Sequence, residues 1–209
     1  MKIAVIGTGS VGGTLGRGWA RAGHEVVFGT RDPGQADVAR LTAESGARAA
    51  AVAEAAAGAE VVALAVPWGA VRDALRQAGG LQGKIVLDCT NPLKPDLSGL
   101  DIGSSAASAA EQVAAWAPGA RVVKIFNSTG FNNMADPRYP EGPAAMLYCG
   151  DDAAAKEAAG RLAVDLGFEP IDAGPLAEAP LLEALALLWI HLAYRQQLGR
   201  EIAFRLMRR

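Results

Sequence analysis

The sequence has few cysteines and no excess of either charge. Only two of its 209 residues are cysteine, Cys89 and Cys149, and neither belongs to a CxxC pair or a histidine cluster. We therefore expect two buried thiols in a reducing compartment and no bound metal. The formal net charge is −2, so nothing predicts a nucleic-acid partner or binding to an anionic membrane surface.

Long hydrophobic runs are also missing. The start, MKIAVIG, is too short for a signal peptide and has no cleavage site. The longest apolar stretch, residues 181–194, contains Glu183 and His191 and is shorter than a membrane span. The composition is that of a globular protein, with 51% hydrophobic and 20% charged residues. We expect a cytoplasmic protein of one domain, or one domain with a small appendage.

Apolar runs of strand length alternate with alanine-rich helical stretches along the chain. VVALAV and KIVLDC are hydrophobic on successive residues, as expected of central strands covered on both faces. The alternation predicts an α/β fold of the Rossmann type, with a doubly wound, mostly parallel sheet. The predicted strands cover residues 3–7, 25–29, 61–67, 84–89, 121–126, 145–149 and 168–172. The predicted helices cover residues 11–22, 36–45, 51–58, 70–77, 106–115 and 153–166.

The chain changes character after about residue 130. A proline-rich loop, NNMADPRYPEGP, precedes another strand–helix pair. Residues 178–208 then predict one long, largely apolar helix, broken or kinked near Pro180. We assign residues 1–135 to a dinucleotide-binding Rossmann domain. Residues 136–209 form a small C-terminal extension of the sheet and a helical cap.

A glycine-rich loop follows the first predicted strand. VIGTGSVG contains G-x-G-x-x-G at Gly7, Gly9 and Gly12, between a strand and a helix of a βαβ unit. Gly7 allows a tight turn, Gly9 lets a pyrophosphate approach the backbone, and Gly12 lets helix and strand pack closely. The diphosphate would meet free N–H groups at the helix start, which Ser10 could instead cap. The predicted loop site comprises Gly7, Thr8, Gly9, Ser10, Val11 and Gly12.

The end of the second predicted strand decides between NAD and NADP. NAD-binding proteins carry a carboxylate about 20 residues beyond the glycine motif, a count that lands on Asp32. GHEVVFGTRDP resembles β-hydroxyacid dehydrogenase-type enzymes, and in that register Thr30 takes the carboxylate position and Arg31 the 2′-phosphate. A hydroxyl and a guanidinium suit a phosphate that a carboxylate would repel. We favour NADP, with Asp32 in the following turn or capping the next helix; a solvated Arg31 is the alternative.

Ligands of doubly wound sheets lie beyond the carboxyl ends of the strands. The predicted site therefore also includes Val66, Pro67, Trp68, Asn91, Pro92 and Asn127. Trp68 is either a wall of the nicotinamide site or a packed aromatic residue, and Asn91 either binds the nicotinamide half or forms an Asx-turn. KIFNSTGFNN adds polar side chains, including Lys124, but no evident acid–base pair. His191 is either a hydrogen-bonded core residue or a substrate contact, and no other catalytic residue is predicted.

Six segments together resemble the NADPH-dependent coenzyme F420 reductases along essentially the whole chain: GTGSVG, GTRDP, VPW, TNPL, KIFN and WIHLAYRQQLGR. NPLK…KIFN is also similar to the oxidoreductase domain of STEAP metalloreductases, whose membrane part has no counterpart in this sequence. The resemblance implies hydride transfer between NADP(H) and F420 or a flavin, FMN or FAD. The second cofactor would lie against the C-terminal helix, and that helix would also form a homodimer. The alternatives are an NADPH-dependent reductase of a small carbonyl or imine and a non-catalytic NADP-sensing protein.

Overall fold

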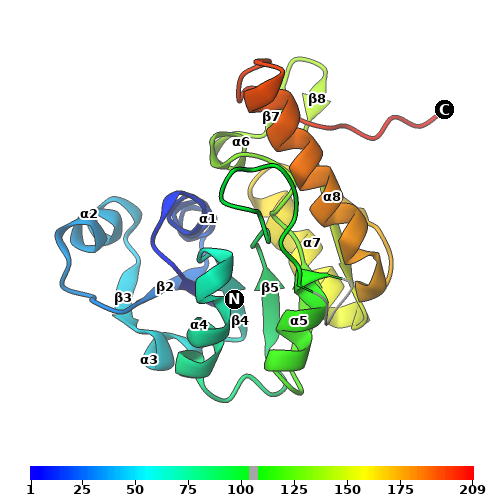
Figure 1. Ribbon diagram of the computed structural model, residues 1–209. Coiled ribbons are helices and arrows are strands. Elements are labelled where there is room, and N and C mark those ends of the chain that lie inside the picture. Colours follow the sequence, from blue (N-terminus) through cyan, green and yellow to red (C-terminus); the bar gives the residue numbers. More distant parts are fainter. Residues whose placement is uncertain (104–107) are drawn as a thin grey trace.

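A single eight-stranded sheet forms the centre of the computed structural model, which describes residues 1–103 and 108–209 (Figure 1). Its strand order is β10-β9-β6-β5-β4-β1-β2-β3. The strands are β1 (Lys2–Ile6), β2 (Glu25–Thr30), β3 (Arg48–Ala51), β4 (Val61–Leu64), β5 (Ile85–Asp88), β6 (Arg121–Lys124), β9 (Ala145–Gly150) and β10 (Glu169–Asp172). Six neighbouring strands, β6, β5, β4, β1, β2 and β3, are parallel to one another. Strand β9 is antiparallel to β6, and β10 is parallel to β9. The predicted Rossmann-type, mostly parallel sheet is confirmed.

Helices cover both faces of the sheet. They are α1 (Ser10–Arg21), α2 (Ala36–Ser45), α3 (Val52–Ala57), α4 (Val71–Ala78), α5 (Ala109–Trp116), α6 (Phe131–Ala135), α7 (Ala153–Asp165) and α8 (Ala179–Ile190). On one face α1 contacts α2, α6 and α7, and on the other α3, α4, α5 and α8 contact one another in that order. Figure 1 shows α2 and β3 at one edge of the molecule and α7 and α8 at the opposite edge.

The core consists of two apolar clusters, one on each face of the sheet. β1, β4 and β5 are buried throughout their central residues because both faces are covered, which explains their continuous hydrophobic runs. Helix α1 lies close to β2: a Cβ at Gly16 would overlap the ring of Phe28. Close packing at Gly16 therefore compensates for the low helix propensity of glycine at this position.

Short elements are where the sequence-based prediction fails. Strand β3 was missed because its sequence, RAAA, favours helix, yet it pairs with β2. The expected loop after residue 130 contains α6 and a hairpin of β7 (Arg138–Tyr139) and β8 (Gly142–Pro143). The predicted start of a helix at residue 106 lies outside the described residues, and α5 accounts for the rest of that helix.

The predicted C-terminal helix over residues 178–208 is wrong in length. Pro180 lies in the first turn of α8 instead of breaking it, and a π-helical turn, His191–Arg195, ends the helical segment. The chain then reverses through Gln197 and Gly199, whose φ angles are 58° and 77°. Beyond them the tail packs back on the fold, where the Ile202 carbonyl accepts a 2.7 Å hydrogen bond from the Trp189 indole. These tertiary bonds replace the helical ones that local propensity favours.

Helix α8 has the length and hydropathy of a membrane span when extended to its flanking turns. The segment Leu176–Arg195 has 20 residues and a mean hydropathy of 1.5. Within the fold it packs against α5 and β9, and its Glu183 is fully buried beside Lys124. This packing explains the apolar residues on the inner face of α8, whereas Leu181 and Leu188 are exposed.

Candidate functional site

The glycine-rich loop joins β1 to α1, and each glycine has a distinct environment. Gly7 has φ +113°, and a Cβ there would overlap the Ala65 carbonyl. A Cβ at Gly12 would overlap the carbonyl oxygen of Gly7, so helix and loop meet without room for a side chain. A Cβ at Gly9 would meet nothing within 4 Å. Gly7 and Gly12 are therefore required by the fold, whereas Gly9 borders the open space that a pyrophosphate needs.

The start of α1 presents free backbone donors. The first hydrogen bond of the helix runs from the Gly13 N–H to the Gly9 carbonyl at 2.8 Å. The N–H groups before Gly13 at the helix start therefore have no partner within the helix. Ser10 is the first helical residue and Gly9 occupies the cap position without a side-chain hydrogen bond. The alternative role of Ser10 as helix cap is thus not found. The arrangement fits an anion at the positive end of the helix dipole.

The tip of β2 places Thr30, Arg31 and Asp32 beside the cleft. The strand ends at Thr30, and the Asp32 carboxylate accepts a 3.0 Å hydrogen bond from the Gly34 N–H. Asp32 therefore forms an Asx-turn, which is the first of its two expected roles. It does not cap α2, because Gln35 is the residue that precedes this helix. Arg31 is exposed and lines the adjoining cleft.

A cleft of about 670 Å³ brings much of the predicted site together. Its predicted lining residues are Gly7, Thr8, Gly9, Thr30, Arg31, Val66 and Pro67. One face of α4, with Ala74 and Gln77, and Ala70 directly before that helix form a further wall. Sequence patterns do not indicate this wall, because small and amide side chains on a helix resemble an ordinary solvated face.

Trp68, at the tip of β4, does not line this cleft. Its ring stacks on Trp116 with centroids 5.5 Å apart and an interplanar angle of 26°. Of the two expected roles, the geometry favours the packed aromatic residue.

Asn91 and Asn127 link the tips of β5 and β6. The Asn91 side-chain amide donates to the Asn127 carbonyl at 2.8 Å, and the Asn127 amide donates back to Asn91 Oδ1 at 3.1 Å. The Asn127 amide also donates to the Leu182 carbonyl of α8 at 3.0 Å. Asn91 therefore forms an inter-strand pair instead of an Asx-turn, and Pro92 after it is buried.

A fully buried ion-pair network lies directly beneath these tips. Lys124 Nζ lies 2.9 Å from Asp88 Oδ2 and 3.3 Å from Glu183 Oε1, and all three side chains have no solvent exposure. It also donates to the Thr90 carbonyl at 2.7 Å. The network joins β5, β6 and α8, and of its three side chains only Lys124 was expected among the polar residues of this edge.

The network contains two carboxyl groups and one amine, and α5 provides further hydrogen-bond donors to one of the carboxyl groups. The Glu183 carboxylate accepts hydrogen bonds from the first two N–H groups of α5, on Ala109 and Ala110, at 3.1 and 3.2 Å. Burial alone would lower the pKa of Lys124, but the carboxylates of Asp88 and Glu183 raise it above its ordinary value. Lys124 is therefore a permanent cation at neutral pH.

Phe126 gives the β6 tip its shape. It has φ +59°, a left-handed conformation that costs a non-glycine residue about 1–3 kcal/mol. Its ring is fully buried, and its centroid lies 5.5 Å from that of the Trp19 ring and 6.3 Å from that of the Phe168 ring. This packing holds the turn that directs Asn127 back toward Asn91.

His191 is half-buried and lies in the π-helical turn after α8. Its Nε2 is 3.2 Å from the side-chain nitrogen of Gln196, an exposed contact. It is therefore not a hydrogen-bonded core histidine, which was one of its two expected roles. Its ring forms no ion pair with a carboxylate among the described residues.

Both cysteines are free and buried, as expected. Burial raises the pKa of the Cys149 thiol to about 12 and raises that of Cys89 further. Within residues 1–103 and 108–209, no group of three His, Cys, Asp or Glu side chains could hold a metal.

The fold and cleft define a Rossmann-type dinucleotide-binding protein. Residues 2–92 match the family model described as "NADP oxidoreductase coenzyme F420-dependent". The chain is 33% identical to the F420-dependent NADP reductase of Methanothermobacter marburgensis, with 95% of each sequence covered. It therefore belongs to the family of F420-dependent NADP oxidoreductases, as the sequence motifs predicted.

Further comparisons extend the similarity to a longer metalloreductase and to solved structures. The chain is 32% identical to the metalloreductase STEAP3 of Rattus norvegicus over 89% of its own length, but it spans only 36% of that protein. A solved structure assigned as an F420-dependent NADP reductase from Arthrobacter sp. FB24 has a TM-score of 0.89 and 36% identity, with both chains fully covered. A reductive aminase of Aspergillus terreus shares the fold at a TM-score of 0.69 and 22% identity, covering 93% of this chain and 62% of that one.

Proposed function

We propose that this protein transfers a hydride between NADP(H) and a deazaflavin, F420, or a flavin such as FMN or FAD. The observation that carries the proposal is the continuous edge formed by the glycine loop, Arg31 and the linked tips of β5 and β6 beneath α8. The bound cofactors supply the hydride chemistry, so the protein needs to hold two rings at reacting distance rather than to provide an acid–base pair.

The N-terminal half of this edge holds the dinucleotide in our proposal. The N–H groups at the start of α1 bind the diphosphate beside Gly9, and the Arg31 guanidinium pairs with the 2′-phosphate. Thr30 leaves room for that phosphate without repelling it, while the carboxylate of Asp32 is engaged by Gly34. These contacts favour NADP over NAD.

The C-terminal half completes the site for the second substrate. We propose that residues 136–209 act as this smaller unit, continuous with the Rossmann sheet through β9. Asn127 supports a role at the junction, because its buried Oδ1 accepts no hydrogen bond from the described residues. We further propose a cytoplasmic homodimer, supported by the exposed leucines Leu181 and Leu188 on α8.

The acceptor is tested by following NADPH absorbance with F420, FMN, FAD and a cyclic imine in separate reactions. Oxidation with F420 or a flavin supports the proposal, and oxidation with the imine alone replaces it with the imine-reductase alternative. If NADPH binds but no acceptor is reduced, the protein is an NADP sensor.

The 2′-phosphate contact is tested with Arg31→Ala. We expect KM for NADPH to rise about 10- to 100-fold, since a hydrogen bond to a charged group contributes roughly 1.5–3 kcal/mol, with little change for NADH. Arg48→Ala, which removes an exposed arginine paired with Glu25 on a neighbouring strand, is the matched control. Equal effects of Arg31→Ala on NADPH and NADH rule out the assignment.

A further inference from the structure

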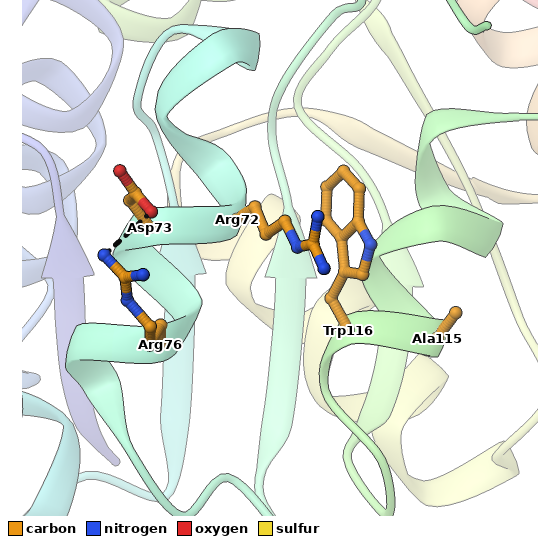
Figure 2. Close-up of a pocket in the computed structure, with 5 residues that line it drawn as sticks. All are labelled: Arg72, Asp73, Arg76, Ala115 and Trp116. Atoms are coloured by element: carbon orange, nitrogen blue, oxygen red, sulfur yellow. Dashed lines mark ion pairs between the residues drawn. The ribbon is translucent and has the colours of Figure 1, made fainter.

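A second cavity of about 540 Å³ lies between α4 and α5, outside the nucleotide cleft. Its lining residues are Arg72, Asp73, Arg76, Ala115 and Trp116 (Figure 2). Asp73 also lines the nucleotide cleft, so the two cavities are separated only by α4.

The charges in this cavity favour an anion. Arg76 is paired with Asp73 at 3.0 Å, and the pair is largely exposed. Arg72 has no ion-pair partner among the described residues, and its guanidinium instead packs over the Trp116 ring, 5.8 Å from the centroid. Figure 2 shows Arg72 reaching from α4 to Trp116 while Arg76 turns back to Asp73. The lining thus contains two guanidinium groups and one carboxylate, and the Arg72 guanidinium donates no hydrogen bond to the described residues.

The aromatic residues tie this cavity to the reaction edge. Trp116 stacks on Trp68, the residue at the tip of β4 that directly follows Pro67 of the nucleotide cleft. Trp68 and Arg72 both pack on the Trp116 ring, which leaves less of that ring free to stack with a planar ligand. The cavity is therefore suited to a flexible anionic chain passing over the tryptophan pair rather than to a second aromatic ring.

We propose that Arg72 and Arg76 bind the anionic tail of the second substrate. This inference rests on the proposed function, because it assigns a place to the part of that substrate that does not react. F420 carries a phosphodiester and several glutamate carboxylates on its side chain, and FMN carries a phosphate. Arginine suits both groups, since its guanidinium forms bidentate hydrogen bonds with carboxylate and phosphate oxygens.

The test compares acceptors that share a ring and differ only in the tail. F420 is paired with the same deazaflavin ending at its ribityl chain, and FMN is paired with riboflavin. KM and dissociation constants are measured for the wild type and for the double variant Arg72→Ala, Arg76→Ala. We expect the variant to bind the tail-bearing acceptor about tenfold more weakly and the tail-less one less than twofold more weakly.

Three controls sharpen the result. Arg161→Ala removes an exposed arginine paired with Glu157 on α7 and should leave both acceptors unaffected. Arg72→Lys with Arg76→Lys keeps the charge and should restore part of the preference for the tail. Free inorganic phosphate, added at increasing concentration, distinguishes a tail subsite from a simple anion site. With NADPH saturating, so that phosphate does not displace it from Arg31, a subsite for the tail predicts that phosphate competes only with tail-bearing acceptors. A loss of the tail preference at high salt confirms its electrostatic origin.

The outcomes separate this inference from the proposed function. A wild type that reduces both members of a pair without preferring the tail-bearing one overturns the inference alone. The same holds if the double variant weakens both members equally. A wild type that reduces none of the four acceptors refutes the proposed function instead.

Discussion

Replacing Lys124 with Met should destabilise the protein strongly. The substitution keeps most of the side-chain volume but leaves the carboxylates of Asp88 and Glu183 buried without their shared cation. Breaking a buried ion pair by removing one partner costs about 3–5 kcal/mol. Some compensation remains, since Asp88 still accepts from the Thr90 N–H and hydroxyl at 3.0 and 2.7 Å. We therefore expect about 3–5 kcal/mol rather than more.

Thermal unfolding at neutral pH measures this effect. A change of 1 kcal/mol shifts Tm by about 2–4 °C in a domain of this size, so the expected decrease is about 6–20 °C. The pKa of Lys124 is raised, so its stabilising charge is fully present below the ordinary lysine value of 10.5 and is lost only at higher pH. Lys94→Met, at an exposed position, is the control. If the two variants unfold at the same temperature, the network contributes nothing to stability.

Three further predictions concern the glycine loop, the thiols and the oligomer. Gly9→Ala should raise KM for NADPH with little loss of Tm, whereas Gly12→Ala should lower Tm sharply; the reverse order contradicts the loop assignment. Cys149 should react slowly with a disulfide reagent at pH 8, because burial keeps its thiol protonated. The free energy of unfolding should fall between about pH 9 and 12, because the thiol loses its proton at lower pH in the unfolded chain than in the folded one. Leu181→Glu with Leu188→Glu should yield monomers by light scattering, and a monomeric wild type refutes the dimer.

The regular part of the fold was predictable because its signals are local. Continuous apolar runs identified the central strands, and Gly7, Gly9 and Gly12 identified the loop between β1 and α1. The turn at Asp32 also followed from chemistry, since Asp before Pro and Gly favours an Asx-turn. In each case the residues that decide the structure are neighbours in the chain.

The C-terminal tail was not predictable in this way. Local propensity favours helix through residue 208, but the chain leaves the helix at Arg195 and packs on Trp189 and β9 instead. The bonds that hold it join residues far apart in the sequence, such as the Phe204 carbonyl and the Ala145 N–H at 2.9 Å. Helix propensity amounts to a few tenths of a kcal/mol per residue and is overridden by such contacts.

The buried network does have a signal in the sequence. Asp88, Lys124 and Glu183 each interrupt an apolar run, in KIVLDC, RVVKIF and LLEALALL. A charged side chain inside a buried segment is too costly to remain unpaired. Two acidic residues and one basic residue in such segments therefore predict that the three side chains pair with one another. Two of them lie at the carboxyl ends of adjacent parallel strands, where the site of a doubly wound sheet is built. Glu183 lies on α8 and shares the ammonium group of Lys124 with Asp88. Moving α8 away would leave a buried charge without its partner, so the ion pair fixes α8 at that edge of the sheet.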